Sequence, residues 1–240
     1  EGLNSLARDL QAKEETIKKL EAMRIDFVAN VSHELRTPLT SIKGYTETLK
    51  SGAINDPEAG PKFLSKIEEN SNRLIALVSD LLDLSQLEGV QGQVHWGVFP
   101  SQSLIEKLET MFYPALGKKK QILRFDLKSS QLEGDRPKLE QLFINLIDNA
   151  SRYTQIGSVI QFKQRSNKTS FIFEVSDNGP GISAEHVPRI FERFYRVDKA
   201  RSRETGGTGL GLSIVKHIVM AHGGNITVHS QLGEGTKFYS

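Results

Sequence analysis

The sequence predicts two folded parts: an antiparallel helical hairpin that forms a dimeric four-helix bundle, followed by an α/β sandwich domain of the α+β class. Apolar residues recur at a spacing of three and four over residues 3–31 and again over residues 61–88, as in helices that pack together. Strand-like and helix-like segments then follow one another to the end of the chain, without the strict repeat of a parallel α/β fold.

Composition excludes several classes of protein. The 240 residues are 38% hydrophobic and 25% charged, so the chain can bury a core and is neither disordered nor collagen-like. Because 31 basic and 29 acidic residues leave a net charge of only +2, nothing indicates nucleic-acid binding. The absence of cysteine excludes disulfides, thiolate nucleophiles and cysteine-ligated zinc. No run reaches the ~18 apolar residues of a membrane span, so we expect no direct membrane contact by these residues.

The first part of the chain predicts a helical hairpin. The seam of its first helix follows a 3-4 alternation through Leu3, Leu6, Leu10, Ile17, Leu20, Phe27 and Val31. Residues 51–61 are rich in Gly, Pro, Asn and Asp and predict a connection, after which residues 61–88 predict a second helix. A first helix of this length has no local partner before residue 61, so dimerisation is favoured. We expect a coiled coil over residues 1–22 and a dimerisation domain over residues 23–88.

The second part of the chain predicts a sheet with helices on one face. Small polar residues over 89–97 predict a linker, and a second domain follows over residues 98–240. Its patterns predict helices near 101–116, 137–153, 184–190 and 211–222, and strands near 121–127, 159–164, 170–177, 225–230 and 236–239.

His33 is the first candidate for chemistry. Helical geometry turns it away from its core-facing neighbours Val31 and Leu35, so it points to solvent. Thr37 lies one turn later on the same face, Glu34 is adjacent, and Pro38 predicts a local bend. Such a cluster suits nucleophilic attack by an imidazole nitrogen, with Glu34 either taking the other ring proton or orienting the tautomer. A solvated surface histidine is the simpler alternative, and a zinc site is excluded because Thr37 stands where a second histidine ligand is required.

The second domain carries candidates for nucleotide binding. Asn145 and Asn149 share one helix face, and two amide oxygens suit Mg²⁺ that arrives with a nucleotide, although helix capping would also explain them. Asp177 opens a glycine-rich turn that ends an apolar strand, and a second glycine run over 206–211 opens the helix that follows. Exposed N–H groups at a helix start bind phosphate. Residues 191–196 and the polar stretch over 197–205 read as a hinged lid, from which Arg196 could reach a γ-phosphate.

Five ordered blocks resemble the sensor histidine kinases of two-component signalling. They are the H box His33–Pro38, the N box Asn145–Ala150, the first G box Asp177–Gly181, the F box Phe191–Phe194 and the last G box Gly207–Leu212. Each block is short, but five in this order are very specific, and the resemblance covers nearly the whole chain from residue 23. It is nearest to the phosphate-regulon sensor branch. The resemblance implies a dimerisation and histidine-phosphotransfer hairpin followed by a Bergerat-type ATP-binding domain, a type shared with gyrase and chaperone ATPases.

The resemblance also implies roles for the H box and the N box. His33 would accept the γ-phosphoryl group of ATP, and Glu34 would act as the base. Thr37 would position a water molecule when the same domain dephosphorylates its partner. Asn145 and Asn149 would hold Mg²⁺.

The remaining implied roles concern the nucleotide. Asp177 would recognise the adenine amino group, and Tyr153 would lie against the base. Arg152 stands where the family more usually has Lys, which puts a direct phosphate contact by this residue in doubt. The other residues implied to bind the nucleotide or to shape its pocket and lid are Gly179, Gly181, Arg196, Gly207, Thr208, Gly209, Leu210 and Gly211.

The resemblance extends to cofactors, partners and location. It implies ATP and Mg²⁺, a homodimer, phosphotransfer to an aspartate of a response regulator, and phosphatase activity toward that regulator. It also implies the cytoplasmic portion of a protein anchored in the bacterial inner membrane, with more protein upstream. Two alternatives remain: an ATPase clamp of the gyrase or chaperone type, and a non-catalytic dimeric scaffold. Such ATPases carry a catalytic Glu in the N-box helix where this chain offers Asn145, and the presence of every motif block argues against a scaffold.

Overall fold

The computed structural model describes residues 2–88, 94–128, 130–166, 171–198 and 207–240. The chain divides into two compact units, Glu1–Leu77 and Val78–Ser240, and the division falls within a helix.

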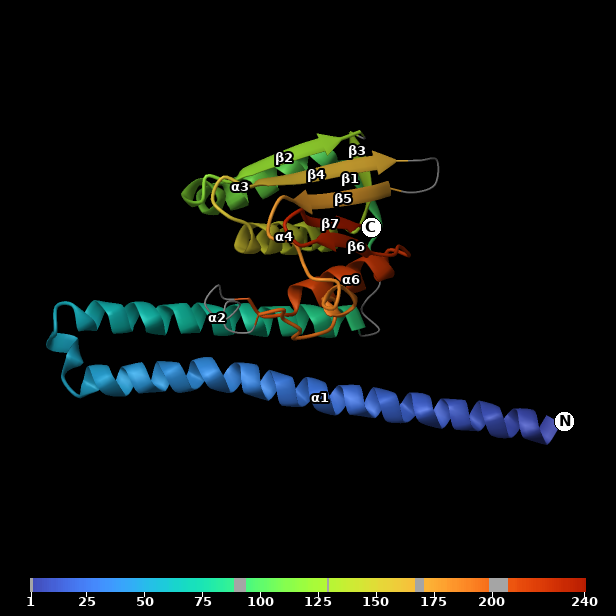
Figure 1. The fold of residues 1–240 in the computed structure, drawn as a ribbon, viewed down its shortest axis with the longest axis horizontal. Coiled ribbons are helices and arrows are strands. Elements are labelled where there is room, and N and C mark those ends of the chain that lie inside the picture. Colours follow the sequence, from blue (N-terminus) through green and yellow to red (C-terminus); the bar gives the residue numbers. More distant parts are fainter. Residues whose placement is uncertain (1, 89–93, 129, 167–170, 199–206) are drawn as a thin grey trace. The chain divides into compact units, whose positions relative to one another are not determined.

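The first unit is the predicted helical hairpin. It contains α1 (Gly2–Lys50), a 3-10 turn (η1, Ala53–Asn55) and most of α2 (Ala59–Glu88), and Figure 1 shows α1 and α2 running antiparallel. Asp56 starts α2, because its Oδ1 accepts the N–H groups of Glu58 at 2.8 Å and Ala59 at 2.9 Å. These two bonds also lower the pKa of the Asp56 carboxyl. The helix α1 continues through Pro38.

The hairpin leaves much of its apolar surface uncovered. Leu49 and Leu77 are buried in this unit. Large apolar side chains that stay exposed along the two helices are Leu10, Ile17, Met23, Ile25, Val28, Leu39, Leu64 and Ile75. Leu10 and Ile17 belong to the predicted seam, and a surface of this kind is what a second hairpin buries in a four-helix bundle.

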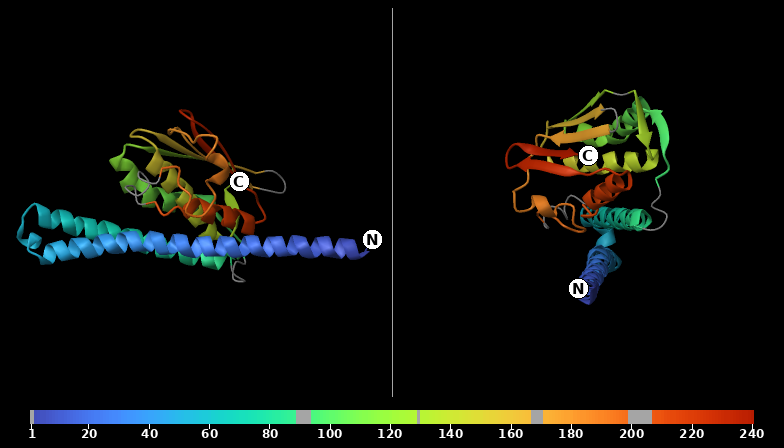
Figure 2. Two further views of the ribbon diagram at one scale, coloured as in Figure 1. Left: turned by 60° about the horizontal axis from the view of Figure 1, so that its bottom comes forward. Right: turned by 90° about the vertical axis from the view of Figure 1, so that its right-hand side faces the viewer.

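The second unit is built on a five-stranded sheet with the order β2-β4-β5-β7-β6. The strands of the sheet are β2 (Ile122–Leu127), β4 (Val159–Ser166), β5 (Phe171–Asp177), β6 (Thr227–Gln231) and β7 (Gly235–Tyr239). Strands β2 and β4 pair in parallel, and the other neighbours pair antiparallel. The unit also contains α3 (Ser101–Lys118), α4 (Arg136–Tyr153) and α6 (Gly211–Ala221), which Figures 1 and 2 place on one face of the sheet.

Alternation along β4 explains why one face is covered. Ile160 and Phe162 are fully buried, and the ring of Phe143 on α4 meets Phe162 edge-on at 4.5 Å between centroids. On the other face, Lys163 pairs with Glu174 of β5 at 3.1 Å. The prediction of a helical hairpin followed by an α+β sheet domain is therefore confirmed.

Two local predictions were wrong or incomplete. The helix expected over 184–190 is only a 3-10 turn, η2 (Val187–Arg189). Pro188 lies in it and has no N–H to bond to a carbonyl of the preceding turn, so it disfavours a longer helix here. An antiparallel pair of short strands, β1 (Gly97–Pro100) and β3 (Gln131–Gly134), had no predicted counterpart. Four-residue strands carry too little alternation to be detected from sequence. Gly89 and Gly92 of the predicted linker, and residues 199–205 of the predicted lid, lie outside the described residues.

Candidate active site

His33 lies on the exposed side of α1, as its position in the helix predicts. The hydroxyl of Thr37 donates to the carbonyl oxygen of His33 at 3.2 Å, so both residues stand on the same face one turn apart. Glu34 behaves differently: its side chain is only 19% exposed, and its Oε2 accepts a hydrogen bond from Nη2 of Arg73 on α2 at 3.0 Å. The carboxylate beside His33 is therefore held between the two helices of the hairpin.

Helix α4 positions the two N-box asparagines. Asp135 caps the helix by accepting the N–H of Lys138 at 3.2 Å, and Pro137 sits in the first turn, where its missing N–H has no cost. Asn145 and Asn149 lie one turn apart, both half-buried. The buried Nδ2 of Asn145 has no hydrogen-bond partner among the described residues. An amide group left open in this way is available to a ligand.

The N box contacts the last G box. A Cβ atom added to Gly211 would lie 3.2 Å from Oδ1 of Asn145, so the first turn of α6 packs directly on this asparagine. Among the described residues, no side chain caps the start of α6, where Leu210 is fully buried and the hydroxyl of Thr208 accepts the N–H of Leu210 at 3.2 Å. An uncapped helix start with free N–H groups next to an open amide is suited to phosphate.

The F box is tied to the same glycine run. The N–H of Phe194 donates to the carbonyl oxygen of Gly209 at 2.8 Å, and Phe194 itself has a positive φ of 62°. Gly209 also has a positive φ, and a Cβ atom there would lie 3.0 Å from Cα of Phe194 and 3.2 Å from Nε of Arg196. The half-buried Arg196 thus lies against the glycine run, close to where the sequence placed it.

Asp177 ends β5 and faces into the first G box. Its Oδ1 accepts the N–H of Gly179 at 2.8 Å. Burial raises the pKa of the Asp177 carboxyl, and the hydrogen bonds from the N–H groups of Gly179 and Thr236 oppose this only in part. A Cβ atom at Gly179 would lie 2.7 Å from Asp177 Oδ1 and 2.8 Å from Cγ2 of Thr154, so only glycine allows this approach. The result is a mostly buried carboxylate suited to bind one hydrogen-bond donor.

Arg152 and Tyr153 close α4. Nε of Arg152 donates to Oδ2 of Asp148 at 2.6 Å, so the guanidinium group is engaged within its own helix. This agrees with the doubt, raised by the sequence, that Arg152 contacts a phosphate directly. Tyr153 is half-buried next to it.

Two family models match the chain. Residues 23–90 match the His Kinase A (phospho-acceptor) domain, and residues 134–240 match the histidine kinase-, DNA gyrase B- and HSP90-like ATPase domain. The histidine kinase AdeS of Acinetobacter baumannii superposes with a TM-score of 0.72 at 30% sequence identity, over 86% of this chain and 95% of AdeS.

The chain belongs to the sensor histidine kinases. The sensor protein kinase WalK of Staphylococcus aureus is 41% identical over 224 residues, which cover 92% of this chain and 54% of that relative. Full-length ShkA, solved in complex with AMPPNP, has 25% identity and a TM-score of 0.64, over 89% of this chain and 44% of ShkA. The chain thus spans about half the length or less of these two relatives.

Membership confirms the kinase prediction and implies an ATP-binding domain, so the clamp and scaffold alternatives are not favoured. The nearer likeness to the phosphate-regulon branch stays a prediction. No helix among the described residues combines the length and apolar character needed to cross a bilayer.

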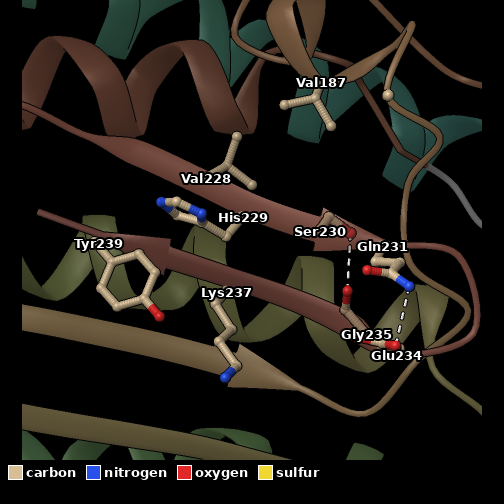
Figure 3. A pocket seen from close by; sticks show the side chains of 10 residues that line it. Val187, Val228, His229, Ser230, Gln231, Glu234, Gly235, Lys237 and Tyr239 are labelled. Atoms are coloured by element: carbon tan, nitrogen blue, oxygen red, sulfur yellow. Dashed lines mark hydrogen bonds between the residues drawn. The ribbon is translucent and has the colours of Figure 1, made fainter.

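A cavity in the second unit is lined by none of the predicted site residues. It measures about 620 Å³ and opens beside β6 and β7 (Figure 3), where His229, Lys237 and Tyr239 line it together with Val187. The ring of His229 meets that of Tyr239 edge-on at 5.4 Å between centroids. The motif residues therefore do not line this cavity.

Sequence reasoning missed Arg73. Nothing in the heptad pattern of α2 distinguishes this arginine from the other charged residues of that helix. A long-range partner for Glu34, 39 positions away, becomes visible only when the hairpin is folded.

Proposed function

We propose that this chain is the phosphotransfer and catalytic portion of a sensor kinase that transfers the γ-phosphoryl group of ATP to His33. The observation that carries the proposal is the packing of Asn145 against the first turn of α6, beside an uncapped helix start. These features are suited to bind a nucleoside triphosphate. The same chain exposes a histidine within its phospho-acceptor domain.

The transfer step follows from the residues of the H box. One ring nitrogen of His33 forms the N–P bond while the bond from phosphorus to the ADP oxygen breaks, and ADP leaves with the electron pair. The proton on the other ring nitrogen passes to the carboxylate of Glu34. Thr37, on the same face as His33, would position water for the opposite activity, dephosphorylation of the regulator.

Asn145 and Asn149 fit a metal that arrives with the nucleotide. Their amide oxygens are hard ligands of the kind that Mg²⁺ prefers. The buried Nδ2 of Asn145, which has no partner among the described residues, is a donor and would bind a phosphate oxygen rather than the metal. Mg²⁺ bound there would neutralise charge on the phosphate oxygens. Asp177 would accept the adenine amino group, and Tyr153 would lie against the base.

Assignment of the glycine-run residues follows from their position at α6. Gly207, Thr208, Gly209 and Gly211 would present backbone N–H groups to the phosphates, with Gly179 and Gly181 shaping the adenine end. Leu210, whose N–H is bound to the hydroxyl of Thr208, would belong to the same binding loop. Arg196 would supply positive charge near the γ-phosphate.

Partners and location complete the proposal. The exposed apolar residues of the hairpin would be buried by a second copy in a homodimeric four-helix bundle. The phosphoryl group would then pass to an aspartate of a response regulator. We place this chain in the cytoplasm, as part of a protein anchored in the bacterial inner membrane.

Incubation with γ-labelled ATP and Mg²⁺ tests the proposal. We expect label bound to the protein that is lost in acid and retained in base, as for phosphohistidine. Release of free phosphate without any labelled protein would instead indicate the ATPase clamp, and binding without turnover would indicate the scaffold.

On acidification, nucleotide affinity is expected to fall at a higher pH than it would if Asp177 had the pKa of an ordinary aspartate. Because burial raises the pKa of Asp177, this carboxylate takes up its proton, and stops accepting the adenine amino group, at a higher pH than usual. Titration of a fluorescent ATP analogue from about pH 7.5 to about pH 4.5 measures this. A profile that stays flat until the ordinary aspartate range would contradict the role of Asp177.

Protonation of Asp177 does not itself unfold the domain. A folded-state pKa above the unfolded value means that this group stabilises the fold below its unfolded pKa and loses that contribution as the pH rises through the folded pKa. Circular dichroism over the same pH range therefore separates loss of binding from loss of structure.

A further inference from the structure

The ion pair between Glu34 and Arg73 differs from the other described ion pairs of the helical hairpin. It joins two helices, and its side chains are 19% and 12% exposed. The other pairs join residues three or four positions apart on one helix, and their side chains are 52–87% exposed: Lys18–Glu14, Lys43–Glu47, Lys62–Glu58 and Lys66–Glu69. Exposed pairs of that kind contribute little, whereas a mostly buried carboxylate needs a partner to remain charged.

The position of this pair connects it to His33. Consecutive residues of a helix point about 100° apart, so Glu34 turns toward α2 while His33 faces solvent. The direction of the Glu34 carboxylate is therefore set by Arg73 on the opposite helix.

We propose that Arg73 is a positioning residue for the phosphoacceptor site. It holds the carboxylate of Glu34 in a fixed direction, so that Glu34 can take the ring proton of His33 when the N–P bond forms. The proposal rests on the function given above, in which Glu34 is the base. Arg73 touches neither substrate nor the reacting atoms, and it acts only through Glu34.

A double-mutant cycle on the whole chain tests this proposal. We expect Arg73→Met to lower the kcat of autophosphorylation about ten-fold and to leave the KM for ATP within about two-fold, because ATP binds elsewhere. Arg73→Lys, which keeps the charge, should stay within about three-fold of the wild type. In a Glu34→Gln background, Arg73→Met should change kcat by less than about two-fold, since the group through which it acts is gone.

Matched controls separate positioning from folding. Lys62→Met removes the cation of an exposed ion pair on the same helix and should leave kcat unchanged. Circular dichroism and the dimer mass verify that each variant is folded. If Arg73→Met does not fold, Arg73→Lys carries the test, with a fall in kcat of up to about three-fold that is present only when Glu34 is present.

The possible results distinguish failure of the positioning role from failure of the proposed function. An unchanged kcat in Arg73→Met, an equal fall in both backgrounds, or a change confined to the KM for ATP would overturn the positioning role. Absence of label on the wild-type chain would overturn the proposed function as well, whereas label with an uncoupled cycle would overturn this inference alone.

Discussion

Replacement of Asp177 by alanine is expected to weaken ATP binding at least about 100-fold, equivalent to ~2.7 kcal/mol. The mostly buried carboxylate would be the acceptor for the adenine amino group, and a site that loses such a buried acceptor discriminates strongly against its ligand. The substitution also removes the bond from Gly179 N–H at 2.8 Å, which orders the first G box. Isothermal titration calorimetry with a non-hydrolysable ATP analogue measures the effect.

Asp126→Ala provides the matched control for this experiment. Asp126 lies on β2 of the same sheet and pairs with Arg165 at 2.6 Å, but it is partly exposed and belongs to no motif block. Its replacement should leave ATP affinity within about two-fold. If Asp177→Ala retained affinity to the same extent while folded, the assignment of the adenine site to Asp177 would be wrong.

Gly181→Ala is expected to cost at least about 3 kcal/mol in the free energy of unfolding of the kinase domain, and to abolish nucleotide binding with it. Gly181 has a positive φ of 72°, and an added Cβ atom would lie 2.0 Å from the carbonyl oxygen of Gln231. That atom belongs to the backbone, so no side-chain rotation can relieve the contact. Urea denaturation followed by fluorescence gives the free energy.

Gly233→Ala isolates the backbone strain from the steric contact. Gly233 has a similar φ of 83°, but an added Cβ atom there would meet nothing within 4 Å. Only the left-handed conformation is then penalised, at about 1 kcal/mol. Equal losses of unfolding free energy in the two variants would contradict a steric role for Gly181 against Gln231, the last residue of β6.

Regular patterns made the main elements of the fold predictable. The heptads of α1 and α2 repeat several times, so the correct period is clear. Short elements lack this redundancy. The four-residue strands β1 and β3 pair with each other across more than 30 positions of sequence. Around Pro188 the sequence resembles a helix, but only the three residues 187–189 form a 3-10 turn.

The candidate site divides in a similar way. His33, Asn145, Asp177 and the glycine runs were found because chemistry fixes residue type and spacing within each block. Sequence could not show that Asn145 packs on Gly211, or that Phe194 bonds to Gly209, because these contacts join separate blocks in space. Arg73 belongs to no block at all, and its role depends on the packing of two helices.

Phosphorylation of His33 is the central claim, and a paired substitution tests it most directly. His33→Gln should reduce acid-labile label from γ-labelled ATP to background, while His229→Gln, which removes an exposed histidine from β6, should label like the wild type. Both variants should bind ATP as the wild type does, because neither residue belongs to the predicted nucleotide site. Undiminished acid-labile label on His33→Gln would contradict the account.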